Sequence, residues 1–160
     1  LRAFFNNAKD LTAAIRKTIE DNEGLKKQVE GYVKEQVKAL RERLVANARD
    51  VNGIKLVQAV IPGESAPDSI KDLAFQIAAQ LPENMLCVIG STNGNKPLLT
   101  VMISKNLIEG RGLHAGNLVR EAAKLIKGGG GGAPHFATAG GKDAAQLEEA
   151  VKRVVALAGI

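Results

Sequence analysis

The chain has 160 residues and a mass of 16.9 kDa, enough for one domain of ordinary size and an appendage. Apolar residues make up 45% of it and charged residues 24%, which is typical of a folded globular protein and excludes a disordered tail. Its apolar runs are far shorter than the ~20 residues that a membrane span requires, and no signal-peptide pattern opens the chain. The one cysteine, Cys87, cannot form an intramolecular disulfide, so we expect a reducing, cytoplasmic setting.

Residues 1–50 are expected to form a helical arm. From Leu11 to Leu44 apolar residues recur mostly three or four positions apart, the spacing of an amphipathic helix. Asn22 and Gly24 predict a bend or break, which makes the arm a helix pair or a loose coiled coil. Its apolar face needs a partner, either the rest of the chain or a second copy, so the arm is also a candidate for homodimerisation.

Residues 51–160 are expected to form a globular domain of the α/β class, a small sheet flanked by helices. Apolar runs bounded by turn residues predict the strands, and helical spacing of apolar residues predicts the helices. The dipeptide Asn93-Gly94 is a strong hairpin signal, and Asp143 is expected to cap the last helix. The strands are expected at 54–61, 85–90 and 98–104, and the helices at 67–81, 113–127 and 143–158.

The net charge of +5 is unevenly distributed along the chain. Residues 96–127 carry six bases and two acids, directly before a run of five glycines. Such an excess is either an ordinary solvated face or a surface for a polyanion. Four Phe, one Tyr and no Trp leave little for bases to stack on, so any contact with a nucleic acid should be to its phosphates and its shape.

The glycine run at 128–132 has two interpretations. It is a flexible linker, or it is a loop whose backbone N–H groups approach an anion closely, with further donors from a helix that begins at Asp143. The run matches neither the phosphate-binding loop of nucleotide hydrolases nor the dinucleotide-binding fingerprint. The residues alone leave both interpretations open.

The wider glycine phrase carries a resemblance. From Gly128 to Gly141 the sequence reads GGGGGAPHFATAGG, and it is followed by Asp143 and a predicted helix. This phrase, with VNGIK at 51–55 and the amphipathic helices before it, is similar to the C-terminal region (C-Ala) of bacterial alanyl-tRNA synthetases over essentially the whole chain. That region is related to the domain attached to DHH-type phosphoesterases, whose glycine-rich segment contacts substrate phosphates. Lys127 departs from the pattern, since the synthetase motif often begins there with a glycine.

The resemblance implies that a longer polypeptide ligates alanine to tRNA with ATP and Mg²⁺, and edits mischarged tRNA in an upstream zinc-containing domain. These 160 residues contain no nucleotide motif, metal cluster or acid–base pair, so we expect no catalytic residue, no metal site and no cofactor here. The chain begins with Leu1, and we expect it to be a piece of that longer polypeptide. The implied role is to bind the outer corner of the alanine tRNA and so let one tRNA serve both active sites, with the upstream domains as further partners.

Two other interpretations remain: the substrate-binding half of a DHH-type phosphoesterase, and a dimerisation module whose globular part is a scaffold. Cys87 is expected to be a buried small hydrophobe and not a nucleophile. The local excess of bases and the glycine phrase together select the candidate tRNA-binding residues. These are Lys105, Arg111, His114, Lys124, Lys127, Gly128, Gly130, Gly131, Gly132 and His135.

Overall fold

The computed structural model describes residues 5 and 10–160, so the start of the expected arm, residues 1–4 and 6–9, lies outside the described residues. The contacts between Cα atoms divide the chain into two compact units, Leu1–Ala39 and Leu40–Ile160. Helix α1, Leu11–Ala46, continues across this division. Among the described residues no helix is both long and apolar enough to cross a membrane.

Helix α1 is one uninterrupted helix of 36 residues, so the expected break at Asn22 and Gly24 is wrong. A glycine in a helix interior costs only about 1 kcal/mol relative to alanine, and asparagine costs less. The Lys, Glu, Gln and Leu residues around them are good helix formers, which is enough to carry the helix through. Asp10 begins it with a local bond in which its Oδ1 accepts from the Ala13 N–H at 3.0 Å.

The second unit contains one six-stranded mixed sheet, which confirms the α/β class. All neighbouring strands run antiparallel except β2 and β3, which are parallel and joined through helix α2. The strand order is β1-β2-β3-β4-β6-β5. The strands are β1 Arg49–Val51, β2 Ile54–Glu64, β3 Met85–Asn93, β4 Lys96–Ile103, β5 Gly129–Gly132 and β6 Phe136–Gly140.

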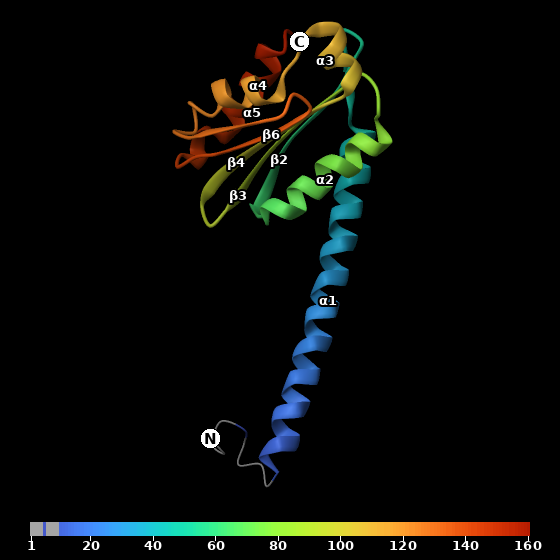
Figure 1. The fold of residues 1–160 in the computed structure, drawn as a ribbon, viewed down its shortest axis with the longest axis vertical. Helices are drawn as coiled ribbons and strands as arrows, with labels where there is room; N and C mark the ends of the chain where they lie inside the picture. Colours follow the sequence, from blue (N-terminus) through green and yellow to red (C-terminus); the bar gives the residue numbers. More distant parts are fainter. Residues whose placement is uncertain (1–4, 6–9) are drawn as a thin grey trace. The chain divides into compact units, whose positions relative to one another are not determined.

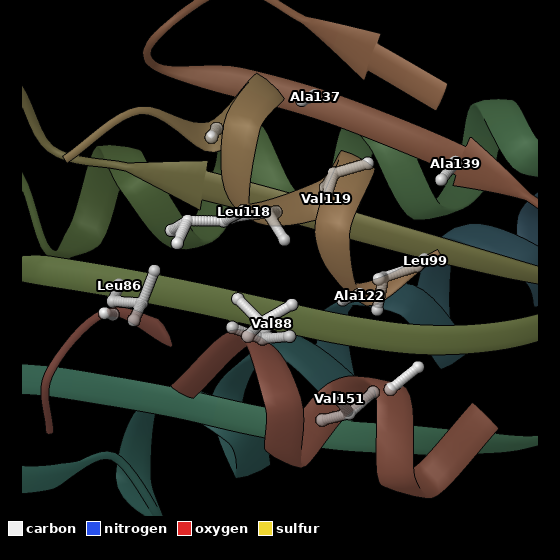
Figure 2. Close-up of a cluster of buried hydrophobic side chains, with 14 of the residues drawn as sticks. Leu86, Val88, Leu99, Leu118, Val119, Ala122, Ala137, Ala139 and Val151 are labelled. Carbon is white, nitrogen blue, oxygen red and sulfur yellow. The ribbon is translucent and has the colours of Figure 1, made fainter. Parts of the chain in front are cut away.

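Helices cover both faces of this sheet, α2 on one side and α4 and α5 on the other (Figure 1). The central strand β3 is buried on both faces, and its residues alternate between them. Leu86 and Val88 join the hydrophobic cluster under α4 and α5 (Figure 2). Cys87 and its neighbours two residues away point to the α2 face, and Cys87 is buried as expected.

Two predicted elements closely match the structure. Helix α2 spans Pro67–Gln80, with its proline in the first turn, and buries Ile70, Leu73, Ala74 and Ile77. Strands β3 and β4 form the hairpin that the Asn93-Gly94 signal predicts. The turn itself is one residue further along, at Gly94 and Asn95, whose φ angles of +56° and +61° fit a primed turn.

The remaining helices differ from the expectation. Helix α3, Lys105–Arg111, was not predicted, and α4 occupies only Ala115–Ala122 of the expected 113–127, followed by turns to Lys127. The last helix, α5, spans Leu147–Leu157 after a 3₁₀ turn at Ala144–Gln146. Asp143 stands at the N-cap position of this 3₁₀ turn, but its side chain makes no capping hydrogen bond and pairs with Lys127.

Candidate nucleic-acid interface

The glycine run is neither a linker nor a free loop. Gly129–Gly132 form β5, an edge strand that pairs antiparallel with β6, and residues 133–135 connect the two strands. Helix α4 packs directly against β5. An extended glycine backbone is stable here because β6 satisfies it along one edge and α4 packs closely against it.

Three glycines of this segment are required by packing. A Cβ atom would lie 1.9 Å from the Gly140 carbonyl oxygen at Gly128 and 2.2 Å from the Thr138 carbonyl oxygen at Gly130. At Gly132, where φ is +158°, the Phe136 carbonyl oxygen would be 2.5 Å away. These positions alternate along the strand, and the obstructing atoms belong to the β6 backbone, which cannot rotate away. No other residue fits at these three positions without moving β6.

The other two glycines have no such requirement. A Cβ at Gly129 would meet nothing within 4 Å, and at Gly131 only the Nη2 atom of Arg120, at 3.6 Å. Neither residue has a φ in the left-handed region. The glycine strand therefore has alternate positions packed against its own hairpin and a bare face, made by Gly129 and Gly131, where added atoms have room. On this face Gly129 is exposed and Gly131 is half-buried beside the Arg120 guanidinium.

The cations expected at the interface are mostly partnered. Lys124 Nζ lies 2.6 Å from Glu121, and Lys127 Nζ lies 3.0 Å from Asp143. The hydrogen bond from Lys124 holds the pKa of the Glu121 carboxyl below its ordinary value. Both lysine side chains are exposed, whereas Asp143 is half-buried, and pairs of this kind are worth little to stability, so their lysines can also face an anion from solvent.

Lys105 and Arg111 lie on a different element, helix α3. Lys105 pairs with Glu109 at 3.6 Å, and Arg111 Nη2 donates to the Asn52 carbonyl at 2.7 Å. Asn52 forms the turn between β1 and β2, at the other side of the sheet from β5. At ~4.8 Å per strand spacing, four spacings separate β2 from β5 by roughly 20 Å. The structure therefore does not bring Arg111 together with the glycine strand.

The two histidines differ in burial and in the element that holds them. His114 is half-buried at the N-terminus of α4, beside Gly116, whose close approach to the Gly132 carbonyl leaves no space for a side chain. Its Nδ1 is buried with no hydrogen-bond partner among the described residues. His135 is exposed in the loop between β5 and β6, where its carbonyl accepts the Ile103 N–H at 2.9 Å.

The helix start near Asp143 does not supply the anion-binding donors expected there. The N–H groups of Lys142 and Asp143 both donate to the Ile126 carbonyl, at 2.9 and 3.0 Å. The first turn of α5 carries Glu148 and Glu149, which would repel an anion. The donors at this end of the hairpin are thus already used by the fold.

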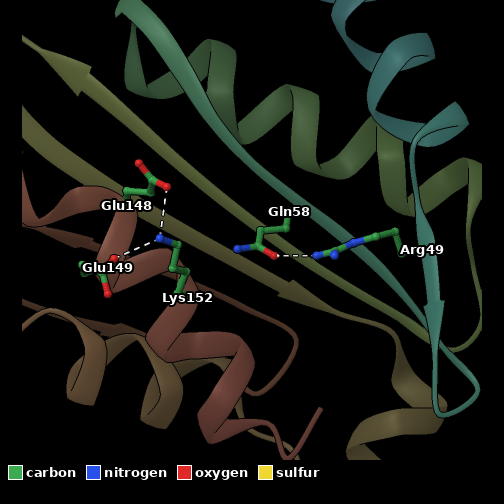
Figure 3. A network of polar contacts seen from close by, with 5 residues as sticks. All are labelled: Arg49, Gln58, Glu148, Glu149 and Lys152. Atoms are coloured by element: carbon green, nitrogen blue, oxygen red, sulfur yellow. Dashed lines mark hydrogen bonds and ion pairs between the residues drawn. The ribbon is translucent and has the colours of Figure 1, made fainter.

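A second polar cluster lies between β2 and α5. Arg49 donates to Gln58 at 3.0 Å, and Lys152 pairs with Glu148 at 3.1 Å and Glu149 at 2.9 Å (Figure 3). Both carboxylates raise the pKa of Lys152. Since the acids offset the bases, this cluster has no net attraction for a polyanion.

One residue at the glycine strand was counted in the basic segment but not selected from the sequence. Arg120 projects from α4 toward the bare face of β5, with its Nη2 atom 3.6 Å from the position of a Gly131 Cβ. Arg120 lies four residues before Lys124, a spacing that places two side chains on the same side of a helical segment. This spacing is the signal in the sequence that could have identified Arg120.

Comparisons with known proteins agree with this fold. The model of the DHHA1 domain family matches residues 53–159. The chain belongs to the DHHA1 domain family. It is 55% identical over all of its 160 residues to an alanine–tRNA ligase of Bacteroides fragilis, and 46% identical to that of Parabacteroides distasonis. It spans 18% of the length of each of these relatives.

Two solved structures resemble this chain. The C-Ala domain of Aquifex aeolicus alanyl-tRNA synthetase matches with a TM-score of 0.59 and 30% identity, covering 69% of this chain and 94% of that domain. The RecJ structure from Thermus thermophilus matches at a TM-score of 0.54 but only 18% identity, over 96% of this chain and 21% of RecJ, so this likeness concerns the fold alone. The expected similarity to the C-Ala domain of alanyl-tRNA synthetases is therefore confirmed.

Proposed function

We propose that this chain is the tRNA-binding C-terminal module of an alanine–tRNA ligase. The observation that carries the proposal is the glycine strand β5, bare on one face and bordered by the basic segment 114–127. A phosphate backbone can approach a strand without side chains, and the cations beside it supply charge and position. The family and the identity to alanine–tRNA ligases over the whole chain support tRNA as the polyanion.

The module contacts the outer corner of the tRNA and keeps one alanine tRNA tethered while it serves aminoacylation and editing. Under this proposal the longer polypeptide is cytoplasmic, uses ATP and Mg²⁺, and holds its zinc site in an upstream domain. Under the same proposal the DHHA1 module itself contributes binding and no catalytic group.

Filter binding of an alanine tRNA transcript across a salt series tests the proposal. The wild-type chain should bind with a strong salt dependence, and Lys124→Gln combined with Lys127→Gln should make the logarithmic slope shallower by ~1.4–1.8, or ~0.7–0.9 for each lost phosphate contact. The matched control is Lys55→Gln with Lys71→Gln, which removes the same charge from β2 and α2. Absence of tRNA binding by the wild-type chain at low salt contradicts the proposal.

A second candidate role, homodimerisation through the arm, rests on the exposed apolar residues of α1. Ile19, Leu25, Val29 and Tyr32 are between 55% and 67% exposed, too large an apolar stripe to remain bare in water. A second copy of the helix would cover it.

Sedimentation of the 160-residue chain tests the dimer. Leu25→Glu with Val29→Glu should convert a wild-type dimer to a monomer, because two carboxylates would be buried in the helix pair. The control, Gln28→Glu with Gln36→Glu, adds the same charge to the same helix at polar positions. A wild-type chain that sediments as a monomer at all concentrations excludes the dimer.

A further inference from the structure

The cations near the glycine strand differ in what they already bind. Lys124 and Lys127 each have a carboxylate partner within 3.0 Å. The guanidinium of Arg120 is exposed and, within residues 10–160, has neither a salt-bridge partner nor a hydrogen-bond acceptor. All five of its N–H donors are therefore available to a ligand.

The guanidinium of Arg120 lies close to the glycine strand β5. Its Nη2 atom lies 3.6 Å from where a Gly131 side chain would begin, so the guanidinium stands over the bare face of β5. At Gly129, further along the same face, a Cβ would meet nothing within 4 Å. An anion held by Arg120 would lie against the strand with no side chain in its way.

The charges around Arg120 leave its guanidinium free to bind an anion from outside the chain, because the nearby carboxylate already has another partner. The nearest acid in sequence, Glu121, is engaged by Lys124, which lowers the pKa of that carboxyl; Arg120 itself contributes least among the charges that do so. The segment 114–127 carries three bases and one acid. A guanidinium fork that is not neutralised locally fits the two oxygens of a phosphodiester better than an ammonium does.

We propose that Arg120 is a direct phosphate contact of the RNA interface, gripping the tRNA backbone over Gly131. This proposal rests on the proposed tRNA-binding function and adds to it a residue that contacts the phosphate backbone. Arg120 is a binding residue in this proposal, since its guanidinium makes no ion pair or hydrogen bond within the described part of the chain that would hold the fold.

The test is filter binding of an alanine tRNA transcript to the 160-residue chain from 50 to 300 mM salt. Arg120→Gln should weaken binding about tenfold at low salt and make the slope shallower by ~0.7–0.9, the loss of one phosphate contact. Arg120→Lys should keep the slope, because it keeps the charge, but bind more weakly than wild type, because it loses the bidentate geometry. The matched control, Lys71→Gln on α2, should change neither.

The two proposals fail in different ways. If the wild-type chain binds tRNA but Arg120→Gln matches Lys71→Gln in affinity and slope, the assignment of Arg120 is overturned and the binding function stands. If the wild-type chain does not bind, both are overturned. Thermal melting followed by circular dichroism should give the same Tm for wild type and Arg120→Gln; a large fall in Tm would overturn the view that Arg120 supports no fold contact.

Discussion

Substituting alanine for neighbouring glycines of β5 should have opposite effects on stability. At Gly130 the new Cβ would lie 2.2 Å from the Thr138 carbonyl oxygen and 2.4 Å from the Ala139 Cα. Because real Cβ contacts are not shorter than about 3.0 Å, β6 must move by nearly 1 Å. Overpacking of this kind costs about 1–3 kcal/mol, and the upper end applies because the obstructing atoms are backbone. At Gly129 nothing obstructs the methyl group.

The expected difference between the two variants is therefore about 3 kcal/mol. Gly130→Ala should lower the free energy of unfolding by about 3 kcal/mol, a large share of the 5–15 kcal/mol of an ordinary domain. Gly129→Ala should leave it unchanged or raise it by about 0.4–1 kcal/mol, because alanine restricts the unfolded chain.

Urea unfolding followed by the reactivity of Cys87 measures this difference. Cys87 is buried in the central strand β3, so a thiol reagent reports on opening of the sheet and not on the α1 arm. Equal free energies for Gly129→Ala and Gly130→Ala, within about 0.5 kcal/mol, would refute the assignment of alternate glycines to a packed and a bare face.

Three further outcomes are expected from the core. Burial raises the pKa of Cys87 from 9.0 to about 12, so the folded state holds the thiol proton more tightly and loses stability as pH rises above 9. Between pH 8 and 10 wild type should lose about 1.4 kcal/mol more than Cys87→Ala, measured by urea unfolding followed by circular dichroism. Leu73→Ala should cost about 2–5 kcal/mol in the same assay by leaving a cavity under α2, whereas Lys71→Gln on the exposed side should cost less than about 0.5 kcal/mol. Gly116→Ala should lower the Tm by several degrees, since its Cβ would lie 2.6 Å from the Gly132 carbonyl oxygen.

Elements with a side-chain pattern could be predicted from the sequence. Helix α2 has apolar residues at helical spacing between Pro67 and Pro82, and β3 is a continuous apolar run that ends near a turn dipeptide. In each case the spacing of the apolar residues in the sequence identifies the type of element and its buried residues. The α/β class followed from these elements.

Elements without such a pattern could not be predicted. A strand of glycines has no alternation to recognise, and β5 forms only because β6 and α4 lie beside it. Its one trace in the sequence is in the partner strand, where Ala137 and Ala139 alternate toward the core. Helix α3 could not be predicted because it has only seven residues and buries only Leu107, so no repeating pattern of apolar residues is present. The choice of packed and bare glycines likewise depends on which atoms of β6 lie opposite each glycine, and this depends on the strand pairing.

Lys127 stands where the family's motif often has a glycine, and the proposed function gives a reason for a lysine at this position. Its φ of +51° lies in the left-handed region, which favours glycine and costs other residues roughly 1 kcal/mol. In its ion pair with Asp143 the lysine is exposed and the carboxylate is half-buried, and a pair with one exposed partner returns about 1 kcal/mol, so stability alone does not explain a lysine here. A cation at the start of β5 does explain it, if a phosphate binds there. Lys127→Gly should therefore keep the free energy of urea unfolding within about 1 kcal/mol of wild type while weakening tRNA binding in the filter assay. Unchanged binding would mean that the lysine serves only its pair with Asp143.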